Sequence, residues 1–164
     1  MTAPTPAHLL LDAHCLIVLE RTLAAVAPEE GCALLLGQRL ETRLTLQTIW
    51  PCRNTWLPAE ERSQRFRLDP REQLLAQRWG RQRGQLVVGA AHSHPSSAAV
   101  PSATDQQLCV GPTLMLIRSG LHQGLEAVRA WWMHENKGAA APPPPAELRI
   151  ELLPATQRAE RLGE

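Results

Sequence analysis

The apolar residues of this chain fall into short runs, and this grouping limits the fold more than any other feature. Each run is five to nine residues long and is bounded by glycine, proline or charged residues. That length is typical of β-strands and too short for most helices. Runs at 32–36, 86–91, 113–117 and 125–133 therefore predict buried strands, and alternation at 148–152 predicts a last one.

Residues 40–50 alternate only in part, which predicts a half-buried strand. Leu40, Thr42 and Leu44 fall on one face, and the alternation slips near Ile49. Residues 51–68 hold prolines and many charges, so they are expected to form an excursion between elements. Residues 1–7 are rich in proline and threonine and are expected to be loose.

Helices are expected at three places between the strands. Asp12 is suited to cap a helix over residues 13–26, and Pro28 closes it. A short helix is expected over residues 102–109, where Ser102 stands at the start.

The remaining helix begins at Asp69 and Pro70, because a carboxylate caps the first turn and proline suits the first helical position. It carries the apolar residues Leu74, Leu75 and Trp79, and it is expected to stop near Gly84.

This order of elements predicts an α+β (mixed α/β) domain in residues 1–137. Four consecutive prolines make residues 138–146 a stiff linker, and residues 147–164 form a strand followed by a charged tail. The chain has 164 residues, enough for one hydrophobic core.

Composition excludes several classes of function. The 17 basic and 16 acidic residues give a net charge of +1, and without an excess of basic residues we expect no nucleic-acid binding. No apolar run is long enough to span a membrane, and the N-terminus lacks a signal peptide, so we expect a cytoplasmic protein. The four cysteines contain no Cys-x-x-Cys pair, which argues against a thiolate zinc site.

The residues that carry chemistry follow the strand at 86–91. His92 and His94 are two positions apart, so at a strand end they project from one face and can chelate one divalent ion. Pro95 stops the strand, and Asp105 follows in the first turn of the short helix. Two imidazoles and one carboxylate leave a fourth tetrahedral position for water, which is the pattern of catalytic zinc. A simpler interpretation is a helix cap, with Ser102 at the N-cap and Asp105 at the third helical position; the two are compatible.

The stretch His-Ser-His-Pro-x5-Pro-Ser-x2-Asp, from His92 to Asp105, resembles the motif of the JAMM (MPN+, or Mov34/PAD-1) zinc metalloproteases, in particular their small stand-alone prokaryotic type. The resemblance extends from about residue 10 to 134. It places Glu30 at the position of the family's catalytic glutamate, ahead of an apolar strand. Ala33 stands where the family usually has glycine. The resemblance implies a curved central sheet flanked by helices, layered as in cytidine deaminases.

The resemblance also implies roles for each residue. One zinc ion (Zn2+) would be held by His92, His94 and Asp105 and would lower the pKa of its water toward about 7. Glu30 would act as the general base, and Ser102 would donate a hydrogen bond to the oxyanion. No further cofactor is expected.

The substrate implied is the C-terminal tail of a ubiquitin-like or sulfur-carrier protein. Such a tail, bound in an extended conformation along a sheet edge, would bring its scissile carbonyl to the zinc. The chain lacks the insertion after Asp105 that helps other members cleave ubiquitin chains. Two alternatives remain: a catalytically inactive MPN scaffold that binds protein partners, and a different metallohydrolase. The oligomeric state is not predicted.

Overall fold

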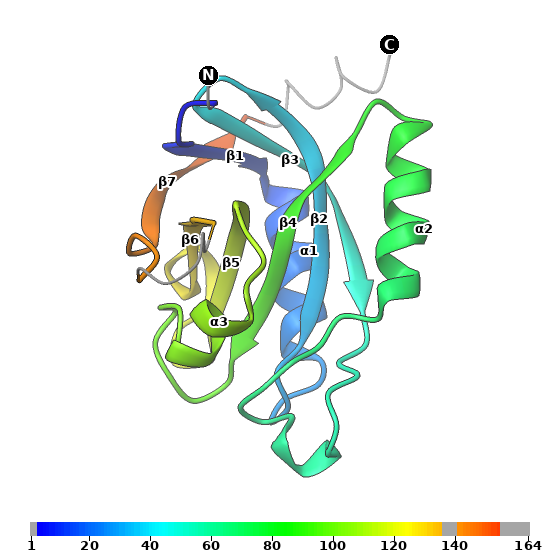
Figure 1. Ribbon diagram of the computed structural model, residues 1–164, viewed down its shortest axis with the longest axis vertical. Coiled ribbons are helices and arrows are strands. Elements are labelled where there is room, and N and C mark those ends of the chain that lie inside the picture. Colours follow the sequence, from blue (N-terminus) through cyan, green and yellow to red (C-terminus); the bar gives the residue numbers. More distant parts are fainter. Residues whose placement is uncertain (1–2, 136–140, 155–164) are drawn as a thin grey trace.

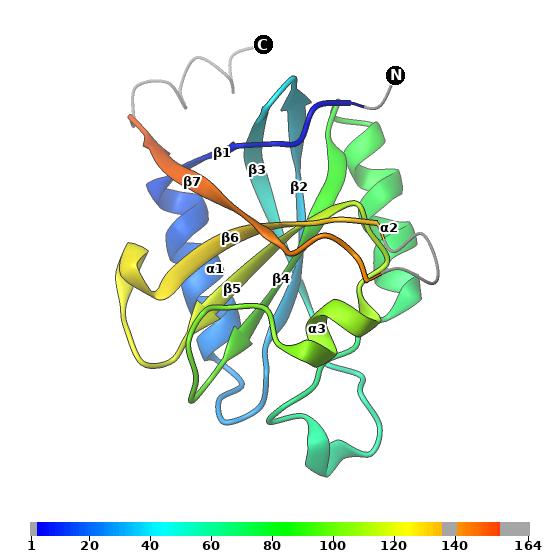
Figure 2. The ribbon, with the colours of Figure 1, turned by 60° about the vertical axis from the view of Figure 1, so that its left-hand side comes forward.

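The computed structural model describes residues 3–135 and 141–154, and these ranges form one closed sheet with helices on both of its faces (Figures 1 and 2). The strands are β1 (His8–Asp12), β2 (Cys32–Leu40), β3 (Arg43–Cys52), β4 (Leu86–His94), β5 (Thr113–Ser119), β6 (Val128–Met133) and β7 (Ala146–Leu153). The helices are α1 (Ala13–Ala24), α2 (Pro70–Arg81) and α3 (Ala103–Leu108), with short 3-10 turns η1 (Ala59–Glu61) and η2 (Gly124–Ala127).

The strand order is β1-β3-β2-β4-β5-β6-β7, and β7 returns to β1 to close a barrel. The expected mixed α/β class is confirmed, but the expected layering of a curved central sheet between helices does not match in detail, because the sheet closes into a barrel. Closure depends on β1, which was not predicted. In this part of the chain, only a loose segment over residues 1–7 and a helix from residue 13 were expected. The five residues of β1 alternate, with Leu9 and Leu11 buried, and they pair in parallel with both β3 and β7.

Helix α1 covers the main core. The Asp12 side chain accepts the backbone N–H of Cys15 at 2.7 Å, which confirms the expected cap. Leu19 and Leu23 of this helix are buried against Leu35 and Leu116 of the sheet. Figure 2 shows α1 and α2 on opposite sides of the strands.

Helix α2 begins at Asp69 and Pro70 as expected, and two of its three large apolar residues are exposed. Leu74 and Leu75 are 68% and 53% exposed. The helix packs through the partly buried Trp79 and through small residues, with Ala76 fully buried against Leu36. Gly80 lies so close to the strand that an added Cβ would meet the Leu36 side chain at 3.0 Å. Small side chains allow this close approach, and counting apolar residues cannot reveal it.

The strand predicted over 40–50 begins later, because Leu40 ends β2 and a turn with Glu41 at φ 53° leads into β3. The predicted slip in alternation is a β-bulge. Leu36 pairs with Thr48 and Gly37 with Leu46, so Gln47 is an extra residue on β3.

Among the described residues, no helix is both long enough and apolar enough to span a membrane.

Candidate metal centre

The carboxyl end of β4 brings two histidines to one face. Successive residues of a strand point to opposite sides, so His92 and His94 project together while Ser93 projects the other way. His92 is fully buried and His94 is 6% exposed. Figure 1 places this end of β4 between α3 and the loop that follows β3.

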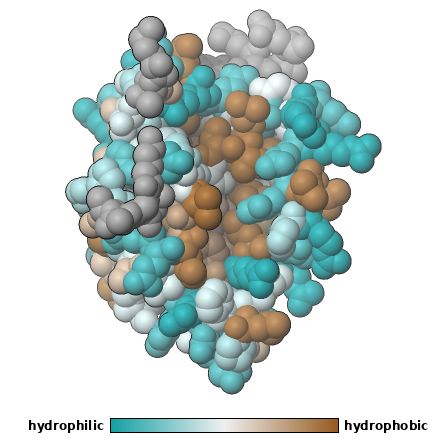
Figure 3. Space-filling view, in the orientation of Figure 1, coloured by the Kyte–Doolittle hydropathy of each residue, from teal (hydrophilic) through white to brown (hydrophobic). Residues whose placement is uncertain are grey.

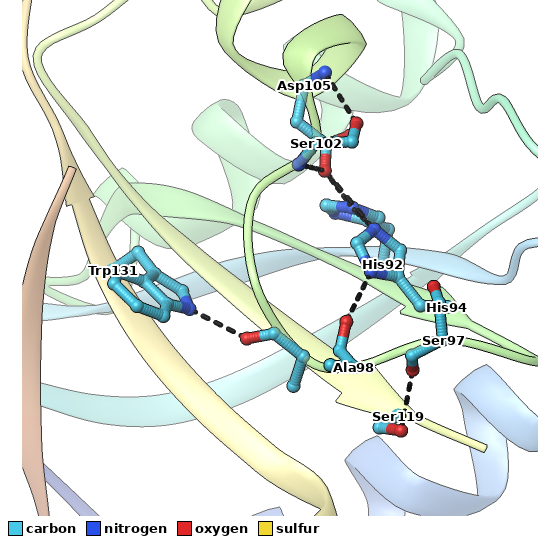
Figure 4. Close-up of polar contacts among 9 residues, drawn as sticks. His92, His94, Ser97, Ala98, Ser102, Asp105, Ser119 and Trp131 are labelled. Atoms are coloured by element: carbon cyan, nitrogen blue, oxygen red, sulfur yellow. Dashed lines mark hydrogen bonds and ion pairs between the residues drawn. The ribbon is translucent and has the colours of Figure 1, made fainter. Parts of the chain in front are cut away.

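Helix α3 supplies the third donor. The Ser102 hydroxyl accepts the Asp105 backbone N–H at 3.0 Å, and Asp105 Oδ2 accepts the Ser102 backbone N–H at 2.8 Å. This capping box confirms the simpler interpretation of Ser102 and Asp105, and it also aims the carboxylate at the histidines (Figure 4). The same turn can therefore both cap the helix and offer a metal ligand.

The three donor atoms converge. His92 Nε2 and His94 Nε2 lie 3.1 Å apart, and each lies 3.2 Å from Asp105 Oδ2. Ligand atoms around a tetrahedral zinc ion lie about 3.3 Å apart, given zinc–ligand lengths of about 2.0–2.1 Å. The donor set of two imidazoles and one carboxylate, together with this spacing, fits one divalent ion.

The second ring nitrogens of the histidines differ. His94 Nδ1 donates to the Ala98 carbonyl at 2.8 Å, which leaves the Nε2 lone pair of the neutral ring facing the other ligands. None of the described residues offers a partner to His92 Nδ1, and the ring is instead stacked on Phe66 at 4.4 Å between centroids.

The pKa values of the three donor residues are set by their burial and by their interactions with the Asp105 carboxylate. Burial alone raises the pKa of Asp105, but its interactions with both histidines outweigh burial and hold that pKa well below its usual range. Burial also lowers the pKa of His92, which favours the neutral ring that binds metals. For His94, burial acts in the same direction, but the Asp105 carboxylate and the Ala98 carbonyl together raise its pKa.

Glu30 interacts electrostatically with His94 and Asp105 of this centre. Its side chain is 5% exposed, and Oε2 has no hydrogen-bond partner in the described part of the chain. Burial raises its pKa to about 7; the His94 ring opposes this shift and the Asp105 carboxylate adds to it. A carboxylate with a pKa near neutrality is suited to accept and return a proton.

Two side chains hold the Glu30 segment in place, and the sequence analysis assigned neither of them a role. Ser93 Oγ accepts the Gly31 N–H at 2.8 Å, and Ser93 N donates to the Gly31 carbonyl at 3.0 Å. Asn54 Nδ2 donates to the Glu30 carbonyl at 3.0 Å and to the Arg65 carbonyl at 2.8 Å. The period-two alternation of β4 already placed Ser93 opposite the histidines, whereas no local signal connects Asn54 to Glu30.

Two further histidines do not belong to the group of metal donors. His8 Nδ1 lies 3.1 Å from Glu151 across the β1–β7 pair, and His122 is exposed in a turn. The four cysteines form no disulfide with one another in the described part of the chain. Burial raises the pKa of Cys32 to about 12, so this thiol is a packing residue and not a nucleophile.

A groove of about 550 Å³ reaches the centre from the outer face of β4. His92 and Asp105 are among the residues that line it, and Val87, Ala90 and Met115 belong to its apolar lining. In the orientation of Figure 1, apolar side chains gather along a hollow beside α2 (Figure 3).

Comparisons with known proteins agree with this geometry. The family model described as prokaryotic homologs of the JAB domain matches residues 13–134. A solution structure of a protein from Desulfitobacterium hafniense is similar at 26% identity and a TM-score of 0.75, over 88% of this chain and 92% of that one. A solution structure of a protein from Salinibacter ruber is similar at 26% identity and a TM-score of 0.61, over 88% and 91%. No curated protein matches. The match spans both histidines, Asp105 and Glu30, and this chain therefore belongs to the family of prokaryotic homologs of the JAB domain.

Proposed function

We propose that the protein is a zinc-dependent peptidase or isopeptidase, which hydrolyses an amide bond. The observation that carries this proposal is the convergence of three buried metal donors beside a carboxyl group whose pKa is near neutrality. A zinc ion held by His92, His94 and Asp105 supplies Lewis-acid activation of water.

The protein's own residues supply the proton transfers. Glu30 takes one proton from the attacking water, whose oxygen forms a bond to the carbonyl carbon of the amide. The C–N bond then breaks, and Glu30 returns the proton to the leaving amine. Ser102 is exposed and its oxygen accepts a backbone N–H, so its hydroxyl hydrogen remains available to the developing oxyanion.

The expected addition of the substrate tail along a sheet edge does not apply to β4. This strand is paired with β2 on one side and β5 on the other, so it offers no free edge at the histidines. The groove over β4 is the alternative approach. We infer that the substrate lies in this groove as an extended chain.

The substrate class that fits is the flexible C-terminal tail of a ubiquitin-like or sulfur-carrier protein. The three donor residues are at most 7% exposed, so a bulky or folded substrate cannot reach them. A thin tail with small residues at the scissile bond can. This assignment rests on the family resemblance together with the burial of the site.

Incubation of the zinc-loaded protein with a sulfur-carrier protein linked through its C-terminus to an amino acid tests the proposal. We expect release of the amino acid, detected by mass spectrometry, and its loss in Glu30→Gln. The adjacent Glu29→Gln is the matched control and should retain activity. Stable binding of the adduct without cleavage would favour the scaffold alternative, and equal cleavage by both variants would contradict the role of Glu30.

A further inference from the structure

The loop over residues 95–101 joins His94 to the helix that carries Asp105, so its shape sets the distance between metal donors on two elements. Three consecutive carbonyls of this loop each accept a side-chain donor from a different strand (Figure 4). The pairs are Ser119 Oγ with the Ser97 carbonyl at 2.7 Å, His94 Nδ1 with the Ala98 carbonyl at 2.8 Å, and Trp131 Nε1 with the Ala99 carbonyl at 2.9 Å.

The middle pair acts directly on a metal donor. The Ala98 carbonyl fixes the tautomer and the orientation of the His94 ring. The next peptide group along the chain ends in the Ala99 carbonyl, which the Trp131 indole holds. A movement of Ala99 would rotate the peptide that joins it to Ala98 and would move the carbonyl away from His94.

Trp131 is built into this position. The residue is 9% exposed and packs with Ala99, Met115 and Ile117 in a cluster separate from the main core. Because Ala99 is 4% exposed, its carbonyl has little access to water if the indole N–H is removed. Trp131 and Trp132 are successive residues of β6 and face opposite sides of the strand, so Trp132 packs in the main core.

We propose that Trp131 is a positioning residue of the metal centre, which acts through the Ala99 and Ala98 peptide groups to hold His94 for zinc. The C-terminal strand β7 supports Trp131 indirectly, through Arg129. The Arg129 guanidinium lies 4.7 Å from the Trp131 ring centroid, and Glu147 of β7 binds Arg129 at 2.7 and 2.8 Å. This half-exposed pair is the weaker part of the arrangement.

The test compares Trp131→Phe with Trp132→Phe. Both remove one indole N–H from β6, but only Trp131 bonds the loop. Zinc affinity is measured by competition with a chelator, and folding by thermal unfolding of the metal-free proteins. We expect a roughly 10–100-fold loss of zinc affinity in Trp131→Phe, as for other residues that orient metal ligands, and less than about a threefold change in Trp132→Phe.

A second readout separates positioning from general loosening. The His94 Nδ1 proton should exchange with solvent faster in Trp131→Phe than in the wild type, as followed by NMR, and should be unchanged in Trp132→Phe. Unchanged zinc affinity and exchange in Trp131→Phe, or equal losses in both variants, would overturn the proposal. The inference rests on the metal site of the proposed function but not on hydrolysis. A protein that binds zinc but cleaves no adduct leaves it intact, and a wild type that binds no zinc overturns it.

Discussion

Glu29 and Glu30 are neighbours in sequence, but the fold gives them different surroundings. Glu29 is half-buried, whereas Glu30 is 5% exposed beside the metal donors. Burial raises the pKa of Glu30 to about 7, and this shift has a consequence for stability in the metal-free protein.

The metal-free protein should lose stability from this residue as the pH rises from about 4.5 to about 7. With a folded pKa of about 7 against an ordinary value of 4.5, the folded state binds more protons than the unfolded state in that window. Glu30→Gln removes this dependence. We expect the free energy of unfolding of Glu30→Gln, minus that of the wild type, to increase by up to about 3 kcal/mol from pH 4.5 to pH 8. Urea unfolding of both proteins at each pH measures this difference. A difference that does not vary with pH would contradict the burial of Glu30 as a carboxyl group.

At the residue scale, the spacing of His92, His94 and Asp105 was sufficient to predict that they come together. A strand end and a helix start fix these positions locally. The stacking of Phe66 on His92 could not be predicted in this way, because it joins a loop to a strand 26 residues away. Contacts of that kind depend on the path of the whole loop.

At the scale of elements, the junction between β4 and the segment before β2 decides where Glu30 lies. Ser93 is the contact, with two hydrogen bonds to the Gly31 peptide. Gly31 itself has no room for a side chain, since an added Cβ would meet the Leu23 carbonyl oxygen at 2.6 Å. The strand β4 therefore positions both the Glu30 segment and the two histidines of the candidate metal centre.

Ser93→Ala should lower hydrolysis more than it lowers zinc binding. The substitution leaves the Gly31 N–H buried without its acceptor, at a cost of about 1–3 kcal/mol in stability, and it frees the Glu30 segment without removing a metal donor. Amide hydrolysis and zinc content are measured side by side, with the exposed Ser96→Ala as control. Loss of zinc in proportion to activity would argue that Ser93 supports the histidines and not Glu30.

The elements themselves were predictable where the pattern is local. The caps at Asp12, Asp69 and Ser102 were expected and are present. Strand β1 was not predicted, because its five residues merge with the helix that follows, and its partners lie far away along the chain.

At the scale of the whole molecule, β7 closes the sheet although it lies beyond the residues that the family model matches. It pairs with β1 in parallel over five residues and with β6 in an antiparallel ladder. Its Leu148 is 3% exposed and belongs to the main core. The predicted alternation of this strand is confirmed, whereas barrel closure depends on long-range pairing that alternation does not encode.

Leu148→Ala should destabilise the protein by about 2–5 kcal/mol, because it leaves a cavity in the core. Leu152→Ala on the same strand should cost less than about 1 kcal/mol, since Leu152 is 45% exposed. Chemical unfolding of the two variants gives the comparison. Equal and small effects would mean that β7 is not part of the core in solution.

The most direct test of the central claim is the zinc content of the purified protein beside that of His94→Ala, measured by elemental analysis. The geometry predicts one zinc ion per chain in the wild type and its loss in His94→Ala. The exposed His122→Ala is the control and should keep its zinc. Equal metal content in wild type and His94→Ala would contradict the assignment of His92, His94 and Asp105 as a metal centre.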